Sequence, residues 1–361
     1  MRELVEEIRR NPLLWLLVFV PVVLAAQTAE PESHTLLFVL SVLAVVPLAA
    51  LLSHATESVA AKTGDAVGGL LNATLGNLTE LIIAFAALRA GQQTLVKASV
   101  AGAIVTNTLF MLGASFLLGG LRHHVQEFNR VNARVQAGLL FLATIALAVP
   151  SAVSQADSAT FTAHLSVGLA VLLMVAYGLG MLFSLKTHKE LFAGADHGEQ
   201  GEAPWPIGLA VATLTGVTVL VALVSEIFVE SVQKAAVAFG MTPAFVGFIV
   251  VALVGAAAEM ASAFSAARKN RLDLSVGIAM GSASQIALFV APVLVLASYL
   301  VGPAPMNLQL WPGAVVMILV ATLTAALVTN SGRSAWFVGV LVLMVYLVFA
   351  LTLYLLPPAA R

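Results

Sequence analysis

The sequence predicts an all-α integral membrane protein with about 11 transmembrane helices: one extra N-terminal helix, then two inverted repeats of five helices each. Three observations predict this class: an apolar composition, a series of long apolar segments, and a pattern that occurs once in each half. Of the 361 residues, 60% are hydrophobic and 10% are charged, whereas soluble domains carry about 25% charged residues. A chain with this apolar composition cannot present a polar surface to water, which excludes a soluble enzyme and a disordered chain.

Net charge and cysteine content narrow the classes further. The formal net charge is −1, so no bulk field attracts a polyanion, and we expect no nucleic-acid partner. The chain contains no cysteine, which rules out disulfides and thiolate metal sites.

Eleven segments are long and apolar enough to span a bilayer, for which about 20 residues are needed. They cover residues 11–27, 35–53, 67–89, 95–120, 134–151, 161–184, 206–225, 242–267, 274–300, 309–329 and 335–356. The first follows Arg9, Arg10 and Pro12 and resembles a signal peptide. Because no small-residue cleavage site precedes Gln27 and further spans follow, we expect an anchored first helix.

Basic residues set the expected orientation, since they concentrate in cytoplasmic loops. With the N-terminus inside, thirteen of the 17 basic residues fall in inner segments. The four on the outer side are Arg89, Lys97, Lys234 and Arg361. We therefore expect a cytoplasmic N-terminus, an outer C-terminus, and residence in a prokaryotic inner membrane.

A polar linker divides the chain. Residues 185–204 contain Gly, Pro and charges of both signs, as expected of a hinge on the cytoplasmic side. The predicted organisation is an extra helix at 1–34, a first five-helix repeat at 35–184, this hinge, and a second five-helix repeat at 205–361.

The second span of each repeat carries a similar pattern. The two stretches are GGLLNATLGNLTELIIAFAALRAG at 68–91 and VGFIVVALVGAAAEMASAFSAARKN at 246–270. Aligning Gly76 with Gly255 places Glu80 on Glu259. Because five spans is an odd number, the halves enter the membrane from opposite sides, which in transporters places the binding site near the midplane.

Glu80 and Glu259 are the carboxylates deepest in apolar spans, and neither has a Lys or Arg within one helical turn. An ionised group in hydrocarbon is costly and usually faces a cavity, a partner or an ion. Two carboxylates with amide and carbonyl oxygens suit a divalent cation such as Ca2+, whereas repulsion within the empty pair favours protonation. Such mutually exclusive occupancy is what an antiporter requires. The alternative is a carboxyl group that stays protonated and hydrogen-bonded to a neighbouring helix.

Small and polar residues accompany these acids. Asn77 shares a helix face with Glu80, three residues away. Gly76 and Gly255 allow either plain helix packing or local unwinding that frees carbonyl oxygens as ligands. Three further polar residues lie in the middle of the spans that follow, as ligands or as interhelical hydrogen-bonding groups: Asn107, Ser282 and Gln285.

Other acids lie where spans end. Glu57, Glu226 and Glu230 mark either an access path for ions or ordinary solvated positions. His54 precedes Glu57 by three residues, a spacing that could hold a metal on one helix face. One such pair is a weak signal, and a satisfied or solvated histidine is the preferred interpretation.

The two patterned stretches resemble the signature repeats of the calcium (cation)/proton exchangers, within the cation/calcium antiporter superfamily. The stretch ARKNRLDLSVGIAMGSASQIALFVAPVLVLAS, which follows the second signature, is also similar. The resemblance implies that Glu80 and Glu259 bind the transported cation and exchange it for protons. It further implies site roles for Asn77, Gly76, Gly255, Ser282 and Gln285, and gating roles for Glu57 and Glu226.

One motif departs from that family's pattern. The second motif usually reads GNAAEH, whereas here residues 255–260 read GAAAEM. Ala256 replaces an amide and Met260 replaces a histidine, so the departure bears on ion selectivity and on the pH dependence of coupling rather than on the fold.

The function expected from these features is secondary antiport of Ca2+ against H+ by alternating access, without enzymatic activity or cofactor. The expected partners are calcium ions, protons and the lipid bilayer, with the oligomeric state left open. Three alternatives remain. The first is Na+/Ca2+ exchange or exchange of another cation, although sodium-coupled relatives carry a serine- and proline-containing motif. The second is a passive cation channel, and the third is an intramembrane metalloenzyme using His54 and Glu57, although no HExxH motif is present.

Overall fold

The computed structural model describes residues 2–63, 65–153, 159–192 and 205–356. Within these residues, nine helices are long and apolar enough to cross a membrane, and one bent helix pair brings the number to ten. The one predicted span not counted among these ten, residues 67–89, consists of two shorter helices in the structure. The predicted class, an all-α integral membrane protein built of two inverted repeats, is confirmed.

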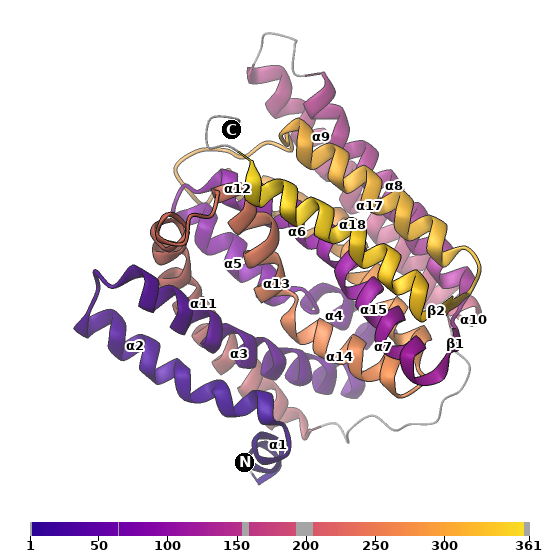
Figure 1. The fold of residues 1–361 in the computed structure, drawn as a ribbon, viewed down its shortest axis with the longest axis horizontal. Coiled ribbons are helices and arrows are strands. Elements are labelled where there is room, and N and C mark those ends of the chain that lie inside the picture. The colour runs from indigo at the N-terminus through magenta and orange to yellow at the C-terminus, as the bar shows by residue number, and fades with distance from the viewer. Residues whose placement is uncertain (1, 64, 154–158, 193–204, 357–361) are drawn as a thin grey trace.

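The N-terminal element precedes the first repeat. It consists of α1 (Arg2–Arg10), a 3-10 helix η1 (Pro12–Val18) and α2 (Phe19–Ala29). Asn11 caps η1, since its side chain accepts a hydrogen bond from the backbone N–H of Leu13 at 3.1 Å. In Figure 1, α2 runs beside α3 at the edge of the molecule.

The first repeat begins with one long helix and continues with shorter ones. Its elements are α3 (His34–Lys62), α4 (Asp65–Leu75), α5 (Leu78–Arg89), α6 (Gln93–Val105), π-helix η2 (Thr106–Met111), α7 (Leu112–His123), α8 (Arg130–Ala152) and α9 (Ala159–Leu182). The π-helix η3 (Phe183–Thr187) and α10 (Lys189–Phe192) follow. Residues 193–204 of the predicted hinge lie outside the described residues.

The second repeat also begins with its longest helix. Its elements are α11 (Ile207–Ala238), α12 (Pro243–Phe245), π-helix η4 (Val246–Val251), α13 (Ala252–Gly255), α14 (Ala257–Arg268), α15 (Leu272–Gln285), π-helix η5 (Ile286–Val290), α16 (Ala291–Ala297), α17 (Pro312–Thr329) and α18 (Trp336–Leu355).

The two long helices α3 and α11 pack antiparallel along each other. Lys234, near the end of α11, contacts His34 at the start of α3, while the backbone N–H of Trp205, just before α11, bonds to Ser58 near the end of α3. The helices have 29 and 32 residues, or about 44 and 48 Å, which exceeds the hydrocarbon thickness of about 30 Å. The predicted ends at 53 and 225 were too early, because the final turns carry polar residues and fall below an apolar threshold.

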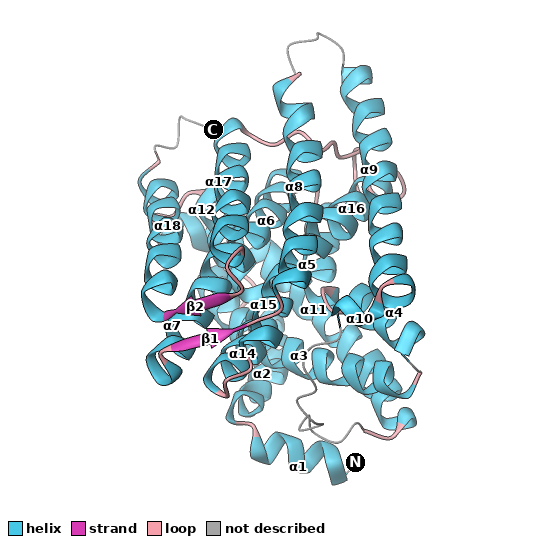
Figure 2. Ribbon diagram, turned by 90° about the vertical axis from the view of Figure 1, so that its right-hand side faces the viewer, coloured by secondary structure: helices cyan, strands magenta, loops and turns pink. Residues whose placement is uncertain are grey.

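A short β-ribbon departs from the all-helical prediction. Strands β1 (Val125–Glu127) and β2 (Arg333–Ala335) pair antiparallel (Figure 2). Arg333 forms a 2.8 Å ion pair with Glu127. The ribbon joins a loop of the first half to a loop of the second. Strands this short carry no readable sequence pattern.

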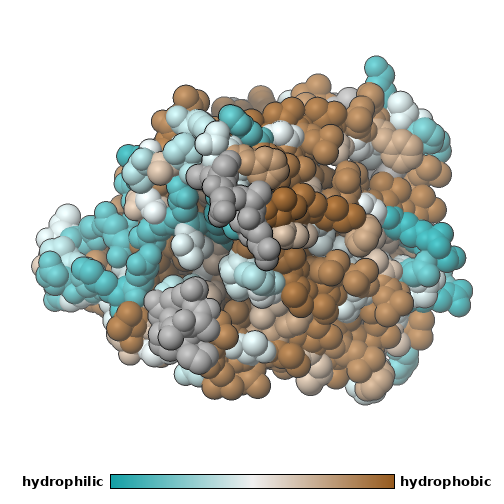
Figure 3. Space-filling view, turned by 90° about the horizontal axis from the view of Figure 1, so that it is seen from above, coloured by the Kyte–Doolittle hydropathy of each residue, from teal (hydrophilic) through white to brown (hydrophobic). Residues whose placement is uncertain are grey.

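The exterior is apolar over wide areas. Hydrophobic side chains cover most of the face in Figure 3, and hydrophilic ones gather mainly towards two edges. Leu300, Leu327 and Leu355 are 91%, 77% and 66% exposed. A continuous apolar exterior of this extent fits lipid rather than water. Helices α1 and the end of α18 lie at opposite ends of the molecule, as an odd number of crossings requires (Figure 1).

Candidate cation-binding site

Each repeat contains a helix that breaks beside its half-buried glutamate. Helix α4 ends at Leu75 and α5 begins at Leu78, with Gly76 and Asn77 between them. Helix α13 ends at Gly255 and α14 begins at Ala257, and the two segments meet at 60°. The breaks fall on the glycines that align between the repeats.

Both glutamates occupy the first turn of the helix that follows the break. Glu80 is the third residue of α5 and Glu259 is the third residue of α14. The first turn of a helix has free backbone N–H groups and the positive end of the helix dipole, which stabilise a carboxylate. The sequence thus places two acids at pseudo-symmetric helix N-termini inside the membrane.

The two half-sites lie against each other. A Cβ atom added at Gly255 would lie 3.0 Å from Cγ of Glu80 and 3.6 Å from its Cδ. Glu80 of the first half therefore packs directly on the helix break of the second half. The carboxylates of Glu80 and Glu259 are close enough to act on each other electrostatically.

A chain of side-chain hydrogen bonds links the halves beside the acids. The Nδ2 group of Asn107 donates to Oγ of Ser282 at 2.8 Å, and Ser282 donates to Oδ1 of Asn77 at 2.7 Å. Asn77 in turn donates from Nδ2 to Oε1 of Gln285 at 2.6 Å. The structure brings together four polar residues that the sequence analysis selected separately, and it joins α5 and η2 of the first half to α15 of the second.

Three buried oxygen atoms in this region have no hydrogen-bond partner within the described residues. They are Oε1 of Glu80, Oε2 of Glu259 and Oδ1 of Asn107. Buried polar atoms are normally satisfied, so each unsatisfied one calls for an explanation. Two carboxylate oxygens and an amide oxygen are hard ligands of the type that Ca2+ prefers.

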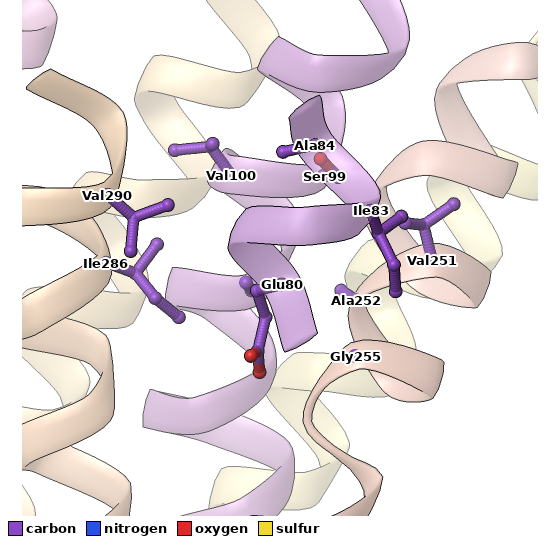
Figure 4. A pocket seen from close by; sticks show the side chains of 11 residues that line it. Glu80, Ile83, Ala84, Ser99, Val100, Val251, Ala252, Gly255, Ile286 and Val290 are labelled. Atoms are coloured by element: carbon purple, nitrogen blue, oxygen red, sulfur yellow. The ribbon is translucent and has the colours of Figure 1, made fainter. Parts of the chain in front are cut away.

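A small cavity extends from Glu80 between the two halves (Figure 4). Glu80 and Gly255 lie at one end in this view, and Ala84, Ser99 and Val100 lie at the other. The remaining lining is mainly aliphatic and comes from both repeats. From Glu80 to Ala84 the cavity follows α5 in the direction of Arg89, the last residue of that helix. The cavity therefore runs towards the end of the molecule where α5 ends and α6 begins.

The acids predicted to mark an access path do not join the central pair. Glu226 forms a 2.9 Å ion pair with Arg89, and Oε2 of Glu230 accepts a 3.5 Å hydrogen bond from Gln27. Glu57 accepts a 3.2 Å hydrogen bond from Ser53. All three acids are exposed. Glu57 lies at the opposite end of the α3–α11 pair from the other two.

His54 contacts an aromatic ring. Its ring lies 4.4 Å from that of Trp205, centroid to centroid. In the part of the chain that the structure describes, no group of three or more His, Asp or Glu side chains is placed to hold a metal ion.

Sequence reasoning missed the cavity lining and the cross-half contacts. Ile83 and Val251 resemble any lipid-facing residue in the sequence, because apolar side chains line the cavity and the exterior alike. The one available indication was Ser99, a polar residue within a predicted span.

An inverted repeat in which each half breaks a membrane helix beside an acid inside the membrane is the architecture of secondary transporters. The family model for sodium/calcium exchanger proteins matches residues 33–186 and again 209–355. The chain therefore belongs to this family of transporters, and the resemblance of its two signature stretches to cation/proton exchangers is confirmed.

Individual relatives are similar over almost their full length. The chain is 39% identical to a Ca(2+)/H(+) antiporter of Aphanothece halophytica, over 95% of this chain and 96% of that protein. It is 38% identical to the Ca(2+)/H(+) antiporter ChaA of Bacillus subtilis, over 89% and 92% of the two chains. The structure of native YfkE superposes on this chain with a TM-score of 0.84 and 34% sequence identity, over 96% of this chain and 100% of that chain.

Proposed function

We propose that the protein is a secondary active antiporter that exchanges a divalent cation, Ca2+, for H+ by alternating access. One observation carries this proposal: Glu80 and Glu259 approach each other from opposite halves, at helix N-termini, each with a buried oxygen that no described group satisfies. The names of the two antiporter relatives support the choice of Ca2+ and H+ as the exchanged ions.

Competition between the two ions follows from the charges of the pair. Two adjacent carboxylates in a low-dielectric environment cannot both remain charged without a counter-ion. Either a divalent cation or protons neutralise them, so binding of one releases the other. A site with this property couples the two fluxes without a separate proton-binding group.

The surrounding residues have supporting roles in this proposal. Asn77, Asn107, Ser282 and Gln285 supply or orient polar groups around the cation, and Gly76 and Gly255 permit the helix breaks. Glu57, Glu226 and Glu230 flank the access routes along α3 and α11.

The orientation and organisation of the chain belong to the same proposal. The N-terminus lies in the cytoplasm of a prokaryotic cell, and the C-terminus lies outside the inner membrane. The chain divides into an extra helix, two five-helix repeats and a cytoplasmic hinge over 185–204.

Uptake of 45Ca2+ into proteoliposomes with an acidic lumen tests the proposal. We expect the wild-type protein to accumulate 45Ca2+ and to stop when the pH gradient is dissipated. Glu80→Gln and Glu259→Gln should each abolish uptake, whereas Glu32→Gln, an acid in an exposed loop before α3, should leave it unchanged. Uptake that survives both central substitutions would refute the proposal, and uptake driven by a Na+ gradient alone would favour sodium-coupled exchange instead.

A further inference from the structure

Two arginine side chains converge on one oxygen atom at the end of the molecule that carries the β-ribbon. Arg130 is the first residue of α8, and Arg134 lies one turn further along the same helix. The Nη2 atom of Arg130 and the Nε atom of Arg134 both donate to Oδ1 of Asn330, at 3.4 and 3.1 Å. The two donor nitrogens therefore lie within two hydrogen-bond lengths of each other.

In the part of the chain that the structure describes, no acid forms an ion pair with either of these arginines. The nearby Arg333 on β2, by contrast, is paired with Glu127 at 2.8 Å. A basic residue at a helix N-terminus also opposes the helix dipole, so helix stability does not explain Arg130. Each guanidinium group has five N–H donors, and the bond to Asn330 leaves most of them available. The pair is thus a concentration of positive charge that an anion can neutralise.

The arginines head an exposed stripe on α8. Residues four apart share a helix face, and Arg130, Arg134 and Gly138 follow this spacing and are all exposed. A Cβ atom added at Gly138 would meet no atom within 4 Å, so the stripe is open one turn beyond Arg134. Further along the helix, the exposed apolar residues of the stripe are Phe141, Leu142 and Ile145.

A second exposed apolar stripe, on α17, begins at the same place. Helices α8 and α17 pack side by side (Figures 1 and 2). Asn330 follows α17, and the exposed apolar residues that precede it at helical spacing are Leu327, Leu323 and Val320. Because Arg134 contacts Asn330, the two stripes meet there and both run into the membrane-spanning region. From Arg134 to Ile145, α8 rises about 16 Å, about half of the hydrocarbon thickness of about 30 Å.

We propose that Arg130 and Arg134 bind the phosphate group of an anionic phospholipid whose acyl chains lie along the exposed stripes of α8 and α17. Guanidinium groups bind phosphate oxygens through paired N–H donors. Basic sites between membrane helices recognise anionic lipid headgroups, and the apolar stripes below this one extend over the depth of one leaflet. A zwitterionic headgroup carries its own cation, which the two arginines repel, so the site prefers phosphatidylglycerol to phosphatidylcholine.

Native mass spectrometry of the delipidated protein, titrated with each lipid, tests the headgroup contact. The wild-type protein should bind its first phosphatidylglycerol molecule about thirtyfold more tightly than phosphatidylcholine with the same acyl chains, which corresponds to about 1 kcal/mol for each arginine. Arg130→Gln with Arg134→Gln should lose this preference. Arg268→Gln with Lys269→Gln removes two exposed charges from the turn between α14 and α15 at the same end of the molecule, and this control should keep the preference. Equal losses in the two double variants would indicate a general charge effect and overturn the proposal.

Gly138→Leu tests the position of the acyl chains without changing the arginines. Its Cβ would meet no protein atom within 4 Å, so the variant should fold like wild type while its side chain occupies the stripe beyond Arg134. The Kd for phosphatidylglycerol should rise about fivefold, the scale of about 1 kcal/mol of lost contact. Gly168→Leu, at an exposed position of α9 where a Cβ is equally free, should bind like wild type. Added phosphatidylglycerol should raise the Tm of wild type and of Gly168→Leu but not that of the arginine double variant.

Three other outcomes would each overturn the proposal. Binding of phosphatidylglycerol by Gly138→Leu as tightly as by wild type would show that no acyl chain lies along α8. Displacement of phosphatidylglycerol by inorganic phosphate at an equal concentration would show that the headgroup alone is bound. Dissociation of an oligomer in Gly138→Leu, in place of loss of lipid, would assign this face to a second copy of the chain.

Discussion

The close contact between Gly255 and Glu80 predicts a graded loss of cation affinity on Gly255→Ala. The added Cβ would lie 3.0 Å from Cγ of Glu80, several tenths of an ångström inside ordinary van der Waals contact. Because the nearest atom belongs to a side chain and not to the backbone, Glu80 can move aside. Overpacking costs 1–3 kcal/mol, and we place this case at about 1 kcal/mol, the low end of that range.

A displaced Glu80 carboxylate should weaken the site more than the fold. A cost of about 1 kcal/mol corresponds to about a fivefold rise in Kd. The measurements are equilibrium binding of 45Ca2+ and thermal unfolding of the same detergent-solubilised preparation. We expect the Kd to rise about fivefold while the Tm changes by no more than a few degrees.

Gly281→Ala is the matched control for this prediction. Gly281 is buried on α15, next to Ser282, but a Cβ there would meet no atom within 4 Å. Its Kd should equal that of wild type. If Gly255→Ala also binds 45Ca2+ like wild type, or if both glycine variants weaken binding equally, the claim that Glu80 is positioned by the opposite helix break is wrong.

Two further predictions concern the contacts between halves and the membrane orientation. The side chains of the Arg89–Glu226 ion pair are 68% and 49% exposed, so loss of the pair should cost about 0–1 kcal/mol of stability. Arg89→Glu should therefore lower the Tm slightly, and the double variant Arg89→Glu with Glu226→Arg should restore it. A large drop in Tm, or one that the double variant does not restore, would show that the side chains do more than pair. Because the chain has no cysteine, Ala304→Cys and Ser331→Cys provide single labelling sites at opposite ends. A membrane-impermeant maleimide added to intact cells should label the first and spare the second, and the reverse pattern would invert the proposed orientation.

The sequence predicted the membrane class and the central acids because both depend on local composition. An apolar run of about 20 residues must be buried in lipid, and an acid within such a run must have a function or a partner. Glu80 and Glu259 stand out on that ground alone. The helix break at Gly76 and Asn77 was foreseen only as one of two readings of the glycines, since glycine allows both close packing and unwinding.

Pairwise contacts across the repeats were beyond the sequence because they depend on how the halves are oriented. Asn77 and Gln285 were both selected as polar residues in spans, yet nothing in a sequence states that Nδ2 of one meets Oε1 of the other. Arg89 was placed on the outer side from the distribution of basic residues, whereas its ion pair with Glu226 on α11 follows from packing. The ends of α3 and α11 were misplaced for a related reason: their polar final turns are stabilised by antiparallel packing, which hydropathy does not report.

Both acids of the pair are linked to the half of the protein that does not carry them, one directly and one through a single side chain. Glu80 of the first repeat rests on Gly255 of the second. Glu259 contacts Ser282 of its own repeat, and Ser282 is hydrogen-bonded to Asn77 and Asn107 of the first. A relative movement of the halves must therefore change the surroundings of both carboxylates at once. That dependence gives alternating access a direct route to ion release, because the same displacement that opens a path also alters the ligands on both sides of the ion.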